Sequence, residues 1–565
     1  MNYTPVQFFS PAPHLAKAAL AGSHRGMSDD YDYIIVGAGS AGCVLAERLT
    51  ANGKNKVLLL EAGGSDRRFY ISMPLGYGKL FYDADVNWLY HAEPDAGLAG
   101  QKDLWPRGKV LGGSSSINAM VYIRGAAEDF DGWKAAGNYG WGWDDVLPAY
   151  KALEDNEGGA DQFRGSGGPL FISQNARDRH ALCTPFIAAA EAAGLHYNSD
   201  FNVARQVGLG HYQMTIKNGR RNSAARAFLR PAMKRKNLNV QTGAHVLRLL
   251  FEDSRAVGVE YQQNGVIKTA KASGEVILSG GAVNSPQVLQ LSGIGPAPLL
   301  NSLGLDVLKA NANVGKHLQD HVGINYTYRM KVPTLNDELR PWWGKLRVGL
   351  KYLLTQSGPL SLSINHGGGF FRTSGKHKRP NMQLYMQAFS TLIPKASERP
   401  ILSPDPFSGM SLGLSNCLPT SRGEIMISSA DPFKHPRITA NALSTDHDTE
   451  EMLEAVKFLR VIAAQKPLAD LIAEELRPGP TSQSDDELIA DFRKRSGTVY
   501  HPSCTCRMGP DAKSSVVDGR LRVHGVQGLR VVDASAFPAI TSGNINAPVM
   551  MLAWKAAEMI LADGR

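Results

Sequence analysis

A histidine lies among small residues near the end of the chain, in the segment Tyr500-His501-Pro502-Ser503-Cys504-Thr505-Cys506-Arg507-Met508-Gly509. An imidazole changes charge near neutral pH, so His501 could accept a proton from a substrate. Cys504 and Cys506 in the same segment have a spacing that also suggests a metal site. Zinc sites normally need two further ligands at suitable spacing, and none stands nearby in the sequence. We therefore interpret the cysteines as small packing residues beside His501 and expect no metal.

A second polar segment, Gly543-Asn544-Ile545-Asn546-Ala547-Pro548, stands closer to the C-terminus. Residues 548–560 have a helix-forming composition, and Pro548 suits a first helical turn. Asn546 would therefore lie just ahead of a helix N-terminus, where polar side chains and the helix dipole favour nearby negative charge.

The opposite end of the chain carries a glycine loop, Gly37-Ala38-Gly39-Ser40-Ala41-Gly42. It follows an apolar run at 33–36, which predicts a buried parallel strand, and it precedes a helical stretch at 43–49. A second buried strand at 57–60 ends at Glu61, 19 residues beyond the last glycine of the loop. This βαβ context predicts a dinucleotide site, because the glycines admit a pyrophosphate to the helix N-terminus. A carboxylate at the ribose position fits an unphosphorylated adenosine, as in FAD or NAD.

Residues 105–125 begin with a second loop rich in glycine and serine, framed by apolar runs at 110–111 and 120–123. Close backbone approach and small hydroxyl groups suit a further contact with a large cofactor. A surface turn is the alternative interpretation.

The middle of the chain predicts more elements of an α/β architecture. Residues 275–278 predict a buried strand, followed by a helix that begins at Pro286 and ends near Gly293. Residues 529–533 predict another strand. Between about 321 and 489, short strand-like runs such as 383–386 and 423–427 stand among proline-rich loops. This pattern of short strands and loops predicts an antiparallel sheet in a second domain that is inserted within the first.

An amphipathic stretch at 339–354 lies inside that second domain. It combines tryptophans and leucines with arginines and lysines. A buried helix with a solvated basic face is one interpretation, and contact with a membrane surface is the alternative.

Length and composition fit a chain of two domains, since 565 residues exceed one simple core. The formal charge of +9 is spread along the chain, so we expect no nucleic-acid partner and at most a mild attraction to anionic substrates or membranes.

Five cysteines do not form a disulfide framework and indicate a reducing compartment, which favours a cytoplasmic protein with membrane association as an alternative. No apolar run reaches the roughly 18–20 residues of a spanning helix. We expect residues 1–29 to be a leader, a tag or a disordered tail.

Together these segments resemble the glucose–methanol–choline (GMC) family of FAD-dependent alcohol oxidoreductases. Residues 108–125 match the first family signature and 281–295 match the second, and the resemblance covers residues 31–565. It is strongest to the branch of choline dehydrogenases and aliphatic alcohol dehydrogenases. The resemblance implies an α/β fold, α+β overall, with a Rossmann-like FAD-binding domain and an inserted antiparallel-sheet substrate domain. The expected ranges are 30–185, 225–320 and 490–565 for the first domain and 186–224 and 321–489 for the second.

The resemblance also implies roles for individual residues. His501 is the expected active-site base, and Asn546 is its expected partner beside the flavin. An imidazole can take the proton of an alcohol while hydride leaves carbon for flavin N5, and an amide can orient the same oxygen. The helix beginning near Pro548 would stabilise the anionic reduced flavin. The residues expected to bind FAD are Gly37, Gly39, Ser40, Gly42, Glu61, Arg107, Val110, Gly113, Asn118, Ala119, Met120, Val121, Val246, Tyr500, Asp533, Ala534, Asn546 and Pro548, and those expected to meet the substrate are His366 and Tyr500.

Two departures from the family patterns refine the expectation. Some members attach FAD covalently to a histidine, and the matching position here is Ile117, so FAD should bind non-covalently. Choline-oxidising relatives have a glutamate just before a Gly-Gly-Phe segment, whereas this chain has His366 there. An imidazole is a poor counter-charge for choline. We therefore expect a neutral primary alcohol, aliphatic or aromatic, that is oxidised to an aldehyde.

A choline dehydrogenase and an oxygen-using alcohol oxidase are the nearest alternatives. A hydroxynitrile-lyase-like enzyme, which would use the same fold without redox chemistry, is an alternative from another class. An NAD-dependent reductase is disfavoured because two extra glycine-rich segments exceed what a nicotinamide domain needs. The sequence leaves the electron acceptor open between oxygen and a quinone-type molecule, and the resemblance favours a dehydrogenase.

Overall fold

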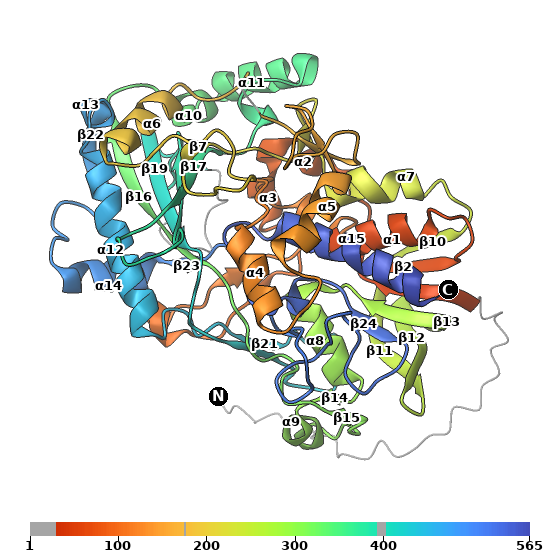
Figure 1. The fold of residues 1–565 in the computed structure, drawn as a ribbon. Coiled ribbons are helices and arrows are strands. Elements are labelled where there is room, and N and C mark those ends of the chain that lie inside the picture. The colour runs from red at the N-terminus through yellow and green to blue at the C-terminus, as the bar shows by residue number, and fades with distance from the viewer. Residues whose placement is uncertain (1–29, 175–176, 393–402, 565) are drawn as a thin grey trace, which may run out of the picture.

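Two large β-sheets organise the chain (Figure 1). The computed structural model describes residues 30–174, 177–392 and 403–564, so the expected leader at 1–29 lies outside the described residues. Strands of the first sheet come from the two ends and the middle of the sequence, and those of the second sheet come mainly from between them. The fold class is therefore the expected α/β arrangement with an antiparallel second sheet.

Five strands of the first sheet run parallel, and their carboxyl ends meet at one edge. In spatial order they are β10 (Leu238–Thr242), β2 (Val57–Glu61), β1 (Asp30–Val36), β13 (Val266–Leu278) and β24 (Leu529–Val531). The strands predicted at 33–36, 57–60, 275–278 and 529–533 are thereby confirmed. In open sheets of this kind, ligands bind outside the carboxyl ends of the strands. The glycine loop and Glu61 both lie at this edge.

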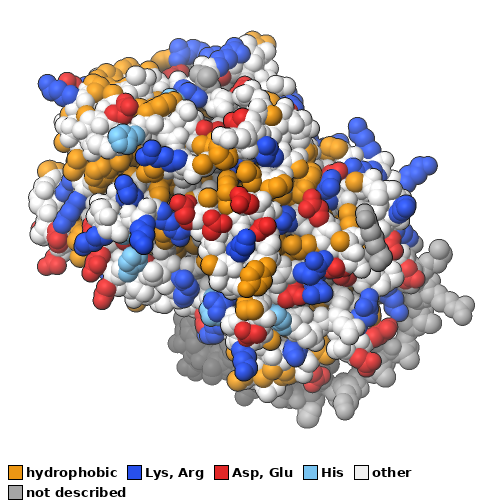
Figure 2. Space-filling model, viewed as in Figure 1, with side chains coloured by type: hydrophobic (Ala, Val, Ile, Leu, Met, Phe, Trp, Pro, Cys, Tyr) orange, Lys and Arg blue, Asp and Glu red, His pale blue; other side chains and the backbone are white. Residues whose placement is uncertain are grey.

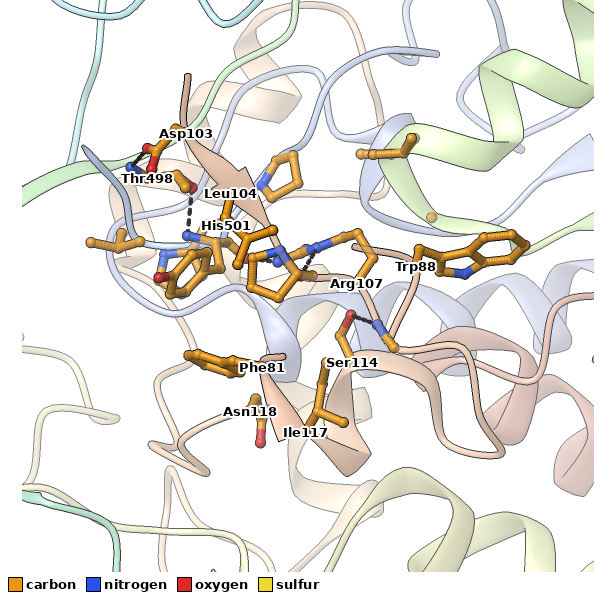
Figure 3. A pocket seen from close by; sticks show the side chains of 18 of the residues that line it. Phe81, Trp88, Asp103, Leu104, Arg107, Ser114, Ile117, Asn118, Thr498 and His501 are labelled. Atoms are coloured by element: carbon orange, nitrogen blue, oxygen red, sulfur yellow. Dashed lines mark hydrogen bonds between the residues drawn. The ribbon is translucent and has the colours of Figure 1, made fainter. Parts of the chain in front are cut away.

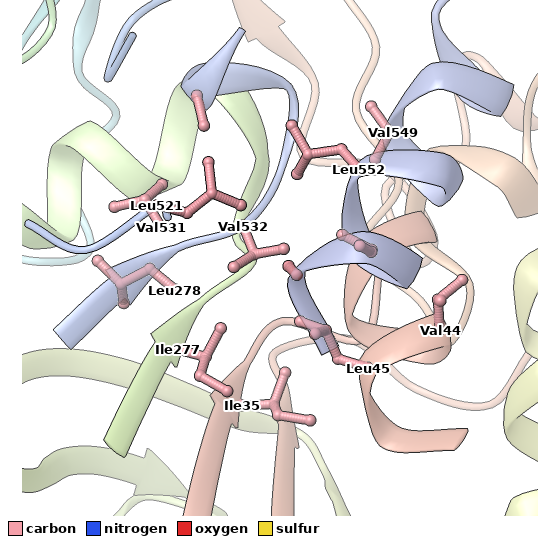
Figure 4. Packing of buried hydrophobic residues seen from close by; sticks show 14 of the residues in the cluster. Ile35, Val44, Leu45, Ile277, Leu278, Leu521, Val531, Val532, Val549 and Leu552 are labelled. Atoms are coloured by element: carbon pink, nitrogen blue, oxygen red, sulfur yellow. The ribbon is translucent and has the colours of Figure 1, made fainter. Parts of the chain in front are cut away.

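The core of this domain explains the unbroken apolar runs of its strands. Helix α1 (Ser40–Thr50) and helix α15 (Asn546–Asp563) pack together beside the sheet (Figure 4). Ile35 and Ile277 from the strands face Leu45 from α1, and Leu552 from α15 lies in the same cluster. Strands buried on both faces need apolar residues at every position rather than at alternate ones.

An antiparallel extension widens the same sheet. Strand β12 (Arg255–Gln263) pairs with the first half of β13, and β11 (Ala244–Glu252) pairs with β12. The second half of β13 pairs with β1 and β24 in parallel, so one long strand joins the two halves of the sheet.

The second sheet is antiparallel throughout its main path. One face is covered by helices α6 (Cys183–Ala192), α12 (Asp446–Ala463) and α14 (Asp485–Arg495), whose apolar residues share a core with the strands. Its strands, in spatial order, are β22 (Ile472–Arg477), β16 (Val322–Met330), β19 (Gly409–Asn416), β18 (Met382–Gln387), β17 (Asn365–Phe371) and β7 (Gly208–His211), and β23 (Gly497–Thr498) also pairs with β16.

Strand alternation divides β18 between two environments. Leu384 and Met386 enter the helix-side core, whereas Tyr385 and Gln387 line a cavity on the opposite face. Successive side chains of a strand point to opposite faces. The second sheet therefore forms a wall of the cavity with one set of side chains and holds its own core with the other.

Two sequence predictions about local structure are wrong. The run at 423–427 forms β20 (Glu424–Met426), which pairs with β21 (Arg437–Thr439) in a small separate hairpin and not in the second sheet. The helix expected to begin at Pro286 begins at Gly281, as α8 (Gly281–Leu291). Proline inside a helix leaves the carbonyl four residues earlier without a backbone donor. Here the Thr505 hydroxyl donates to that carbonyl, Ala282 O, at 2.7 Å, which makes the interior proline tolerable.

Buried charges tie the segment after the second glycine-rich loop to the rest of the chain. Glu154 Oε1 lies 2.7 Å from Arg124 Nη2 and 2.9 Å from Arg164 Nε, and all three side chains are almost fully buried. Arg164 Nη1 also lies 2.9 Å from Asp200 Oδ2. Removing one member of a buried ion cluster leaves uncompensated charge in a low dielectric.

We expect Glu154→Gln to lower the free energy of unfolding by about 3–5 kcal/mol, because two buried guanidinium groups lose their shared counter-charge. Urea denaturation followed by tryptophan fluorescence measures the change. Glu260→Gln is the matched control, because Glu260 pairs at the surface with Arg248, which is 57% exposed, and its loss should cost less than about 1 kcal/mol. Equal losses in the two variants would contradict the prediction.

Candidate functional site

A cavity of about 1720 Å³ lies between the carboxyl edge of the first sheet and the inner face of the second. At one end it is lined by the glycine loop, Glu61 and the residues after β13. At the other end it is lined by Tyr385, Tyr500 and His501. Its volume and its two kinds of lining fit an extended cofactor with a substrate chamber beyond it.

The glycine loop gives a bound group access to backbone at the start of α1. Gly37 has a φ of +99°, and a Cβ there would stand 2.6 Å from Ser279 O. A Cβ at Gly42 would stand 1.9 Å from Gly37 O, so only glycine lets the helix pack against its own loop. No side chain caps α1, whose first residues line the cavity. Uncapped N–H groups at a helix N-terminus bind phosphate oxygens.

Glu61 is held at the end of β2 by two backbone donors. Its Oε2 accepts from Ala38 N at 2.9 Å, and its Oε1 accepts from Gly63 N at 2.8 Å. Burial raises the pKa of Glu61 to about 7, against the lowering effect of those hydrogen bonds. A carboxylate so placed can accept from the hydroxyls of a ribose in the adjoining cavity.

The second glycine-rich loop rests on the first. Gly112 N donates to Ala38 O at 2.7 Å, and a Cβ at Gly113 would stand 2.7 Å from Gly39 Cα. Gly113, Asn118 and the residues that follow it line the cavity. The structure therefore brings the two loops together on one cavity, and the interpretation of the second loop as a surface turn is wrong.

Most residues predicted to bind a cofactor line this cavity, and a few do not. Gly42 and Pro548 are buried within helices α1 and α15, and Val110 is buried in a small apolar cluster with Ile117. These three serve the packing of the cofactor-side elements instead of facing the cavity. The predicted residues that line it are Gly37, Gly39, Ser40, Glu61, Arg107, Gly113, Asn118, Ala119, Met120, Val121, Val246, Tyr500, Asp533, Ala534 and Asn546.

Ile117 lines the cavity with a hydrocarbon side chain (Figure 3). It belongs to the same buried apolar cluster as Ile71 and Leu80. It offers no nucleophile or nitrogen to a cofactor. The residue therefore fits a cofactor that is held without a covalent bond at this position.

The backbone at Tyr500 is strained and firmly held. Its φ of +71° lies in the left-handed region that side-chain-bearing residues rarely adopt. Arg107 Nη2 donates to Tyr500 O at 2.7 Å, and His501 N donates to Asp320 Oδ1 at 2.8 Å. Figure 3 shows Arg107, Thr498 and His501 gathered on one side of the cavity, with Phe81 and Asn118 across from them. The two hydrogen bonds fix both sides of the peptide that carries His501.

Burial sets the charges around this turn. It lowers the pKa of Arg107 to about 10 and raises the pKa of Asp320 to about 7. Arg107 thus stays cationic at neutral pH, whereas Asp320 can exchange its proton there. Burial, with the neighbouring His321 and Arg107, holds the pKa of His501 well below its usual range. His501 is therefore a neutral imidazole.

The hydrogen-bond chain behind His501 assigns its tautomer. His321 Nε2 lies 3.2 Å from Cys417 O, and a carbonyl oxygen only accepts, so His321 carries its proton on Nε2. Burial lowers the pKa of His321 to about 4, which leaves its Nδ1 as an acceptor. His321 Nδ1 lies 3.0 Å from His501 Nδ1, so His501 is the donor in that contact. His501 Nε2 is then unprotonated and faces the cavity as a base.

Asn544, and not Asn546, lies against this nitrogen. Asn544 Nδ2 is 3.2 Å from His501 Nε2, and Asn544 Oδ1 accepts from Gln383 Nε2 at 3.2 Å. Because Gln383 donates to the amide oxygen, the amide nitrogen of Asn544 must point toward His501. The geometry thus corrects the pairing expected for Asn546.

Asn546 belongs to the cofactor end of the cavity. It is the first residue of α15, and its Oδ1 accepts from Ser40 Oγ of the glycine loop at 2.7 Å. The N-terminus of α15 therefore meets the N-terminus of α1 at the cavity. Both helix dipoles favour negative charge there.

His366 does not reach the cavity, which corrects its expected contact with substrate. The preceding residue, Asn365, lines the cavity, and its Oδ1 accepts from Gln387 Nε2 at 2.9 Å. His366 is buried on the other side of β17, where its Nδ1 accepts from His180 N at 3.2 Å. The alternation of side chains along a strand separates the two residues.

Three residues of the histidine site were missed from the sequence. His321 and Asp320 approach His501 from a distant segment with no spacing relation to it. Asn544 stood in a segment already singled out, and its position two residues before Asn546 was the available signal. Cys504 and Cys506, by contrast, lie in the apolar core as expected for packing residues. Across the described ranges, no group of three His, Cys, Asp or Glu side chains could hold a metal ion.

Comparisons with known proteins point to one family. The family model described as GMC oxidoreductase matches residues 31–323 with its N-terminal part and 419–553 with its C-terminal part. The chain is 43% identical to the mitochondrial choline dehydrogenase of Homo sapiens, over 97% of this chain and 92% of that protein. It is also 43% identical to the alcohol dehydrogenase [acceptor] of Pseudomonas putida, over 94% of this chain and 96% of that protein.

Solved structures show the same fold. A pyridoxine 4-oxidase from Mesorbium loti aligns with a TM-score of 0.85 at 33% identity, over 94% of this chain and 99% of that one. A variant of the formate oxidase of Aspergillus oryzae RIB40, solved to follow FAD modification, aligns with a TM-score of 0.87 at 27% identity, over 94% of this chain and 98% of that one.

We expect Glu61→Ala to weaken FAD binding about tenfold or more, because two backbone donors and an adenosine hydroxyl lose a charged acceptor. The absorbance ratio at 450 and 280 nm after purification, and titration of stripped protein with FAD, measure the loss. Glu260→Ala is the surface control and should retain its flavin. Unchanged FAD affinity in Glu61→Ala would show that this carboxylate only holds its own loop.

Proposed function

This chain belongs to the GMC oxidoreductase family of FAD-dependent enzymes that act on CH–OH groups, and we propose that it oxidises a neutral primary alcohol to an aldehyde. The observation that carries the proposal is the assigned tautomer of His501, which presents an unprotonated Nε2 to the cavity. A base of this kind is what alcohol oxidation needs at the substrate oxygen.

The residues present fit FAD. The glycine loop leaves room that a Cβ at Gly37 would fill, and α1 begins without a side-chain cap. The carboxylate of Glu61 can accept hydrogen bonds from ribose hydroxyls. When bound, FAD supplies the acceptor for the hydride that leaves the alcohol carbon. The chain itself supplies binding, orientation and the proton acceptor.

The substrate hydroxyl would contact both His501 and Asn544 from the cavity side. Its proton passes to His501 Nε2, and its oxygen accepts from Asn544 Nδ2, the two atoms that now lie 3.2 Å apart. Gln383 holds the amide in this orientation, and His321 holds the imidazole in its tautomer. The oxygen is therefore oriented before the carbon gives up hydride. Tyr500, whose ring lies 5.2 Å from that of Phe81, forms an apolar wall beside it.

A neutral substrate is favoured because the lining carboxylates are already engaged. Glu61 and Asp533 are bound by backbone donors at the cofactor end. Asp103 accepts from Thr498 N at 2.7 Å, and Asp491 pairs with Arg495. Among the described lining residues, these four are the carboxylates. Two of them lie at the cofactor end, Asp491 already has an arginine as its counter-charge, and burial raises the pKa of Asp103 to about 6, so the substrate end offers little negative charge to a quaternary ammonium.

Choline is the second candidate, and aromatic rings are the observation in its favour. Tyr77, Phe81, Tyr385 and Tyr500 line the cavity, and aromatic faces can bind a quaternary ammonium without a carboxylate. The identity to a choline dehydrogenase adds support. The similarity to the solved pyridoxine 4-oxidase supports instead the proposed neutral alcohol, in its aromatic form.

For the acceptor we propose a quinone-type molecule, with oxygen as the alternative, because the relative from Pseudomonas putida is named a dehydrogenase with an acceptor and not an oxidase. A cytoplasmic location with peripheral membrane contact accompanies this proposal. The five free cysteines, all buried, suit a reducing compartment. Within the described residues, the longest apolar helices fall short of what crossing a bilayer requires.

Anaerobic mixing of the flavin-loaded enzyme with a panel of alcohols tests the proposal. We expect neutral primary alcohols, aliphatic or aromatic, to bleach the flavin faster than choline does. Repetition in air with peroxide detection separates oxidase from dehydrogenase behaviour. Faster bleaching by choline would overturn the substrate class, and a flavin that stays oxidised with every alcohol would favour a lyase.

Substitutions separate the two asparagines. We expect His501→Ala to slow flavin reduction by about 10²–10⁴-fold and Asn544→Ala by about tenfold or more, because both groups contact the reacting oxygen. Asn546→Ala should reduce flavin retention more than it slows reduction of the flavin that remains. Stopped-flow reduction rates and flavin content measure the two effects. A larger rate loss in Asn546→Ala than in Asn544→Ala would restore Asn546 as the partner of His501.

A further inference from the structure

An exposed apolar surface lies on helix α11 (Trp342–Thr355) and the adjoining helix α2 (Phe69–Ser72). The ring of Phe69 lies 6.5 Å from that of Tyr352, which joins the two helices. In the part of the chain that the structure describes, sixteen large hydrophobic side chains are exposed, and eight of them belong here. These eight, which define the α2–α11 surface, are Phe69, Tyr70, Trp342, Trp343, Leu346, Leu350, Leu353 and Leu354.

Helical spacing shows that this exposure is organised. Trp342, Leu346 and Leu350 follow one another at intervals of four residues, so they share one face of α11. Val348 and Tyr352 occupy the opposite face, where they are buried. A helix normally buries its apolar face. Here α11 packs on the protein through the face that carries Val348 and Tyr352. The face with more large apolar side chains is exposed to solvent.

Basic side chains accompany the apolar face. Lys345, Arg347 and Lys351 are exposed on α11, and the helix contains no Asp or Glu. Arg347 lies 3.4 Å from Glu338 of the preceding helix, and Arg220 donates to Gln356 at the end of α11. The upper part of Figure 2, where Figure 1 places α11, shows basic and hydrophobic side chains next to one another. Tryptophan and leucine beside lysine and arginine are typical of helices that lie in a membrane interface.

The segment that carries α2 also reaches the cavity. It continues through Tyr77 and Phe81, both of which line the cavity, and Phe81 contacts Tyr500 beside the base. The surface and the substrate chamber are therefore connected by one short stretch of chain.

We propose that the α2–α11 surface docks this enzyme on an anionic lipid bilayer, with α11 lying in the headgroup region. Charge decides between the candidate occupants. A second copy of the chain would bring the three basic residues of α11 against the same three residues, whereas an anionic bilayer complements them. The formal charge of +9 acts in the same direction. This inference rests on the proposed function in one respect: a quinone-type acceptor dissolved in the bilayer would reach the enzyme at the α2–α11 surface. Binding to lipid does not itself require that acceptor.

Sedimentation with vesicles tests the docking. The probes are vesicles of phosphatidylcholine with phosphatidylglycerol and vesicles of phosphatidylcholine alone, mixed with the full-length flavin-loaded enzyme. We expect binding to the anionic vesicles, weaker binding to the neutral ones, and a blue shift of tryptophan fluorescence as Trp342 and Trp343 leave water. The double variant Leu346→Glu/Leu350→Glu should bind the anionic vesicles about tenfold more weakly.

A matched control comes from another exposed apolar pair. Val266 and Ile267 are 57% and 60% exposed on the β12–β13 hairpin, so Val266→Glu/Ile267→Glu adds the same charge elsewhere and should leave vesicle binding unchanged. Alcohol oxidation with a soluble dye acceptor should persist in both variants, which shows that they fold.

Absence of vesicle binding by the unmodified enzyme, or equal loss in both variants, would overturn the inference. The inference would also be overturned if the unmodified enzyme were a dimer in the absence of lipid and Leu346→Glu/Leu350→Glu were a monomer. The surface would then join two copies of the chain. Failure of the proposed alcohol chemistry is a separate outcome, because vesicle binding is measured without substrate turnover.

Discussion

The left-handed backbone at Tyr500 is the constraint on which the catalytic geometry depends. That conformation is costly, and it persists because Arg107 holds the carbonyl on one side and Asp320 holds the amide on the other. Arg107 precedes Tyr500 by 393 residues in the sequence. The turn aims the His501 ring into the cavity, so the position of the base is a property of the assembled fold and not of its local segment.

The second sheet sets the chemistry of the base as well as walling the cavity. Cys417, just after β19, fixes the proton on His321, and Gln383 in β18 turns the amide of Asn544. Each contact selects one of two states that would otherwise be close in energy. Burial reinforces the selection because it disfavours the charged imidazole at both histidines. A neutral, directed acceptor results without a carboxylate behind it.

Local patterns predicted much of the fold but less of the site. Continuous apolar runs identified β1 and β2, because strands buried on both faces leave no other pattern, and the glycine loop identified the cofactor end. Pro286 misled the prediction because its compensating donor, Thr505, lies far away in sequence. His366 and Asn546 misled it because adjacent or near-adjacent residues on a strand or turn point in different directions. His321 could not be predicted as a site residue, because no motif or spacing in the sequence around it indicates a contact with His501.

The pairing of α1 with α15 has a consequence for how the protein is made. Helix α1 leaves the ribosome about 500 residues before α15, the helix that packs against it. An incomplete chain therefore carries an uncovered apolar face on α1 and lacks both Asn544 and the second helix N-terminus at the cavity. Cofactor capture and shielding of that face both await the synthesis of α15. A chain that lacks α15 would lose solubility and flavin together.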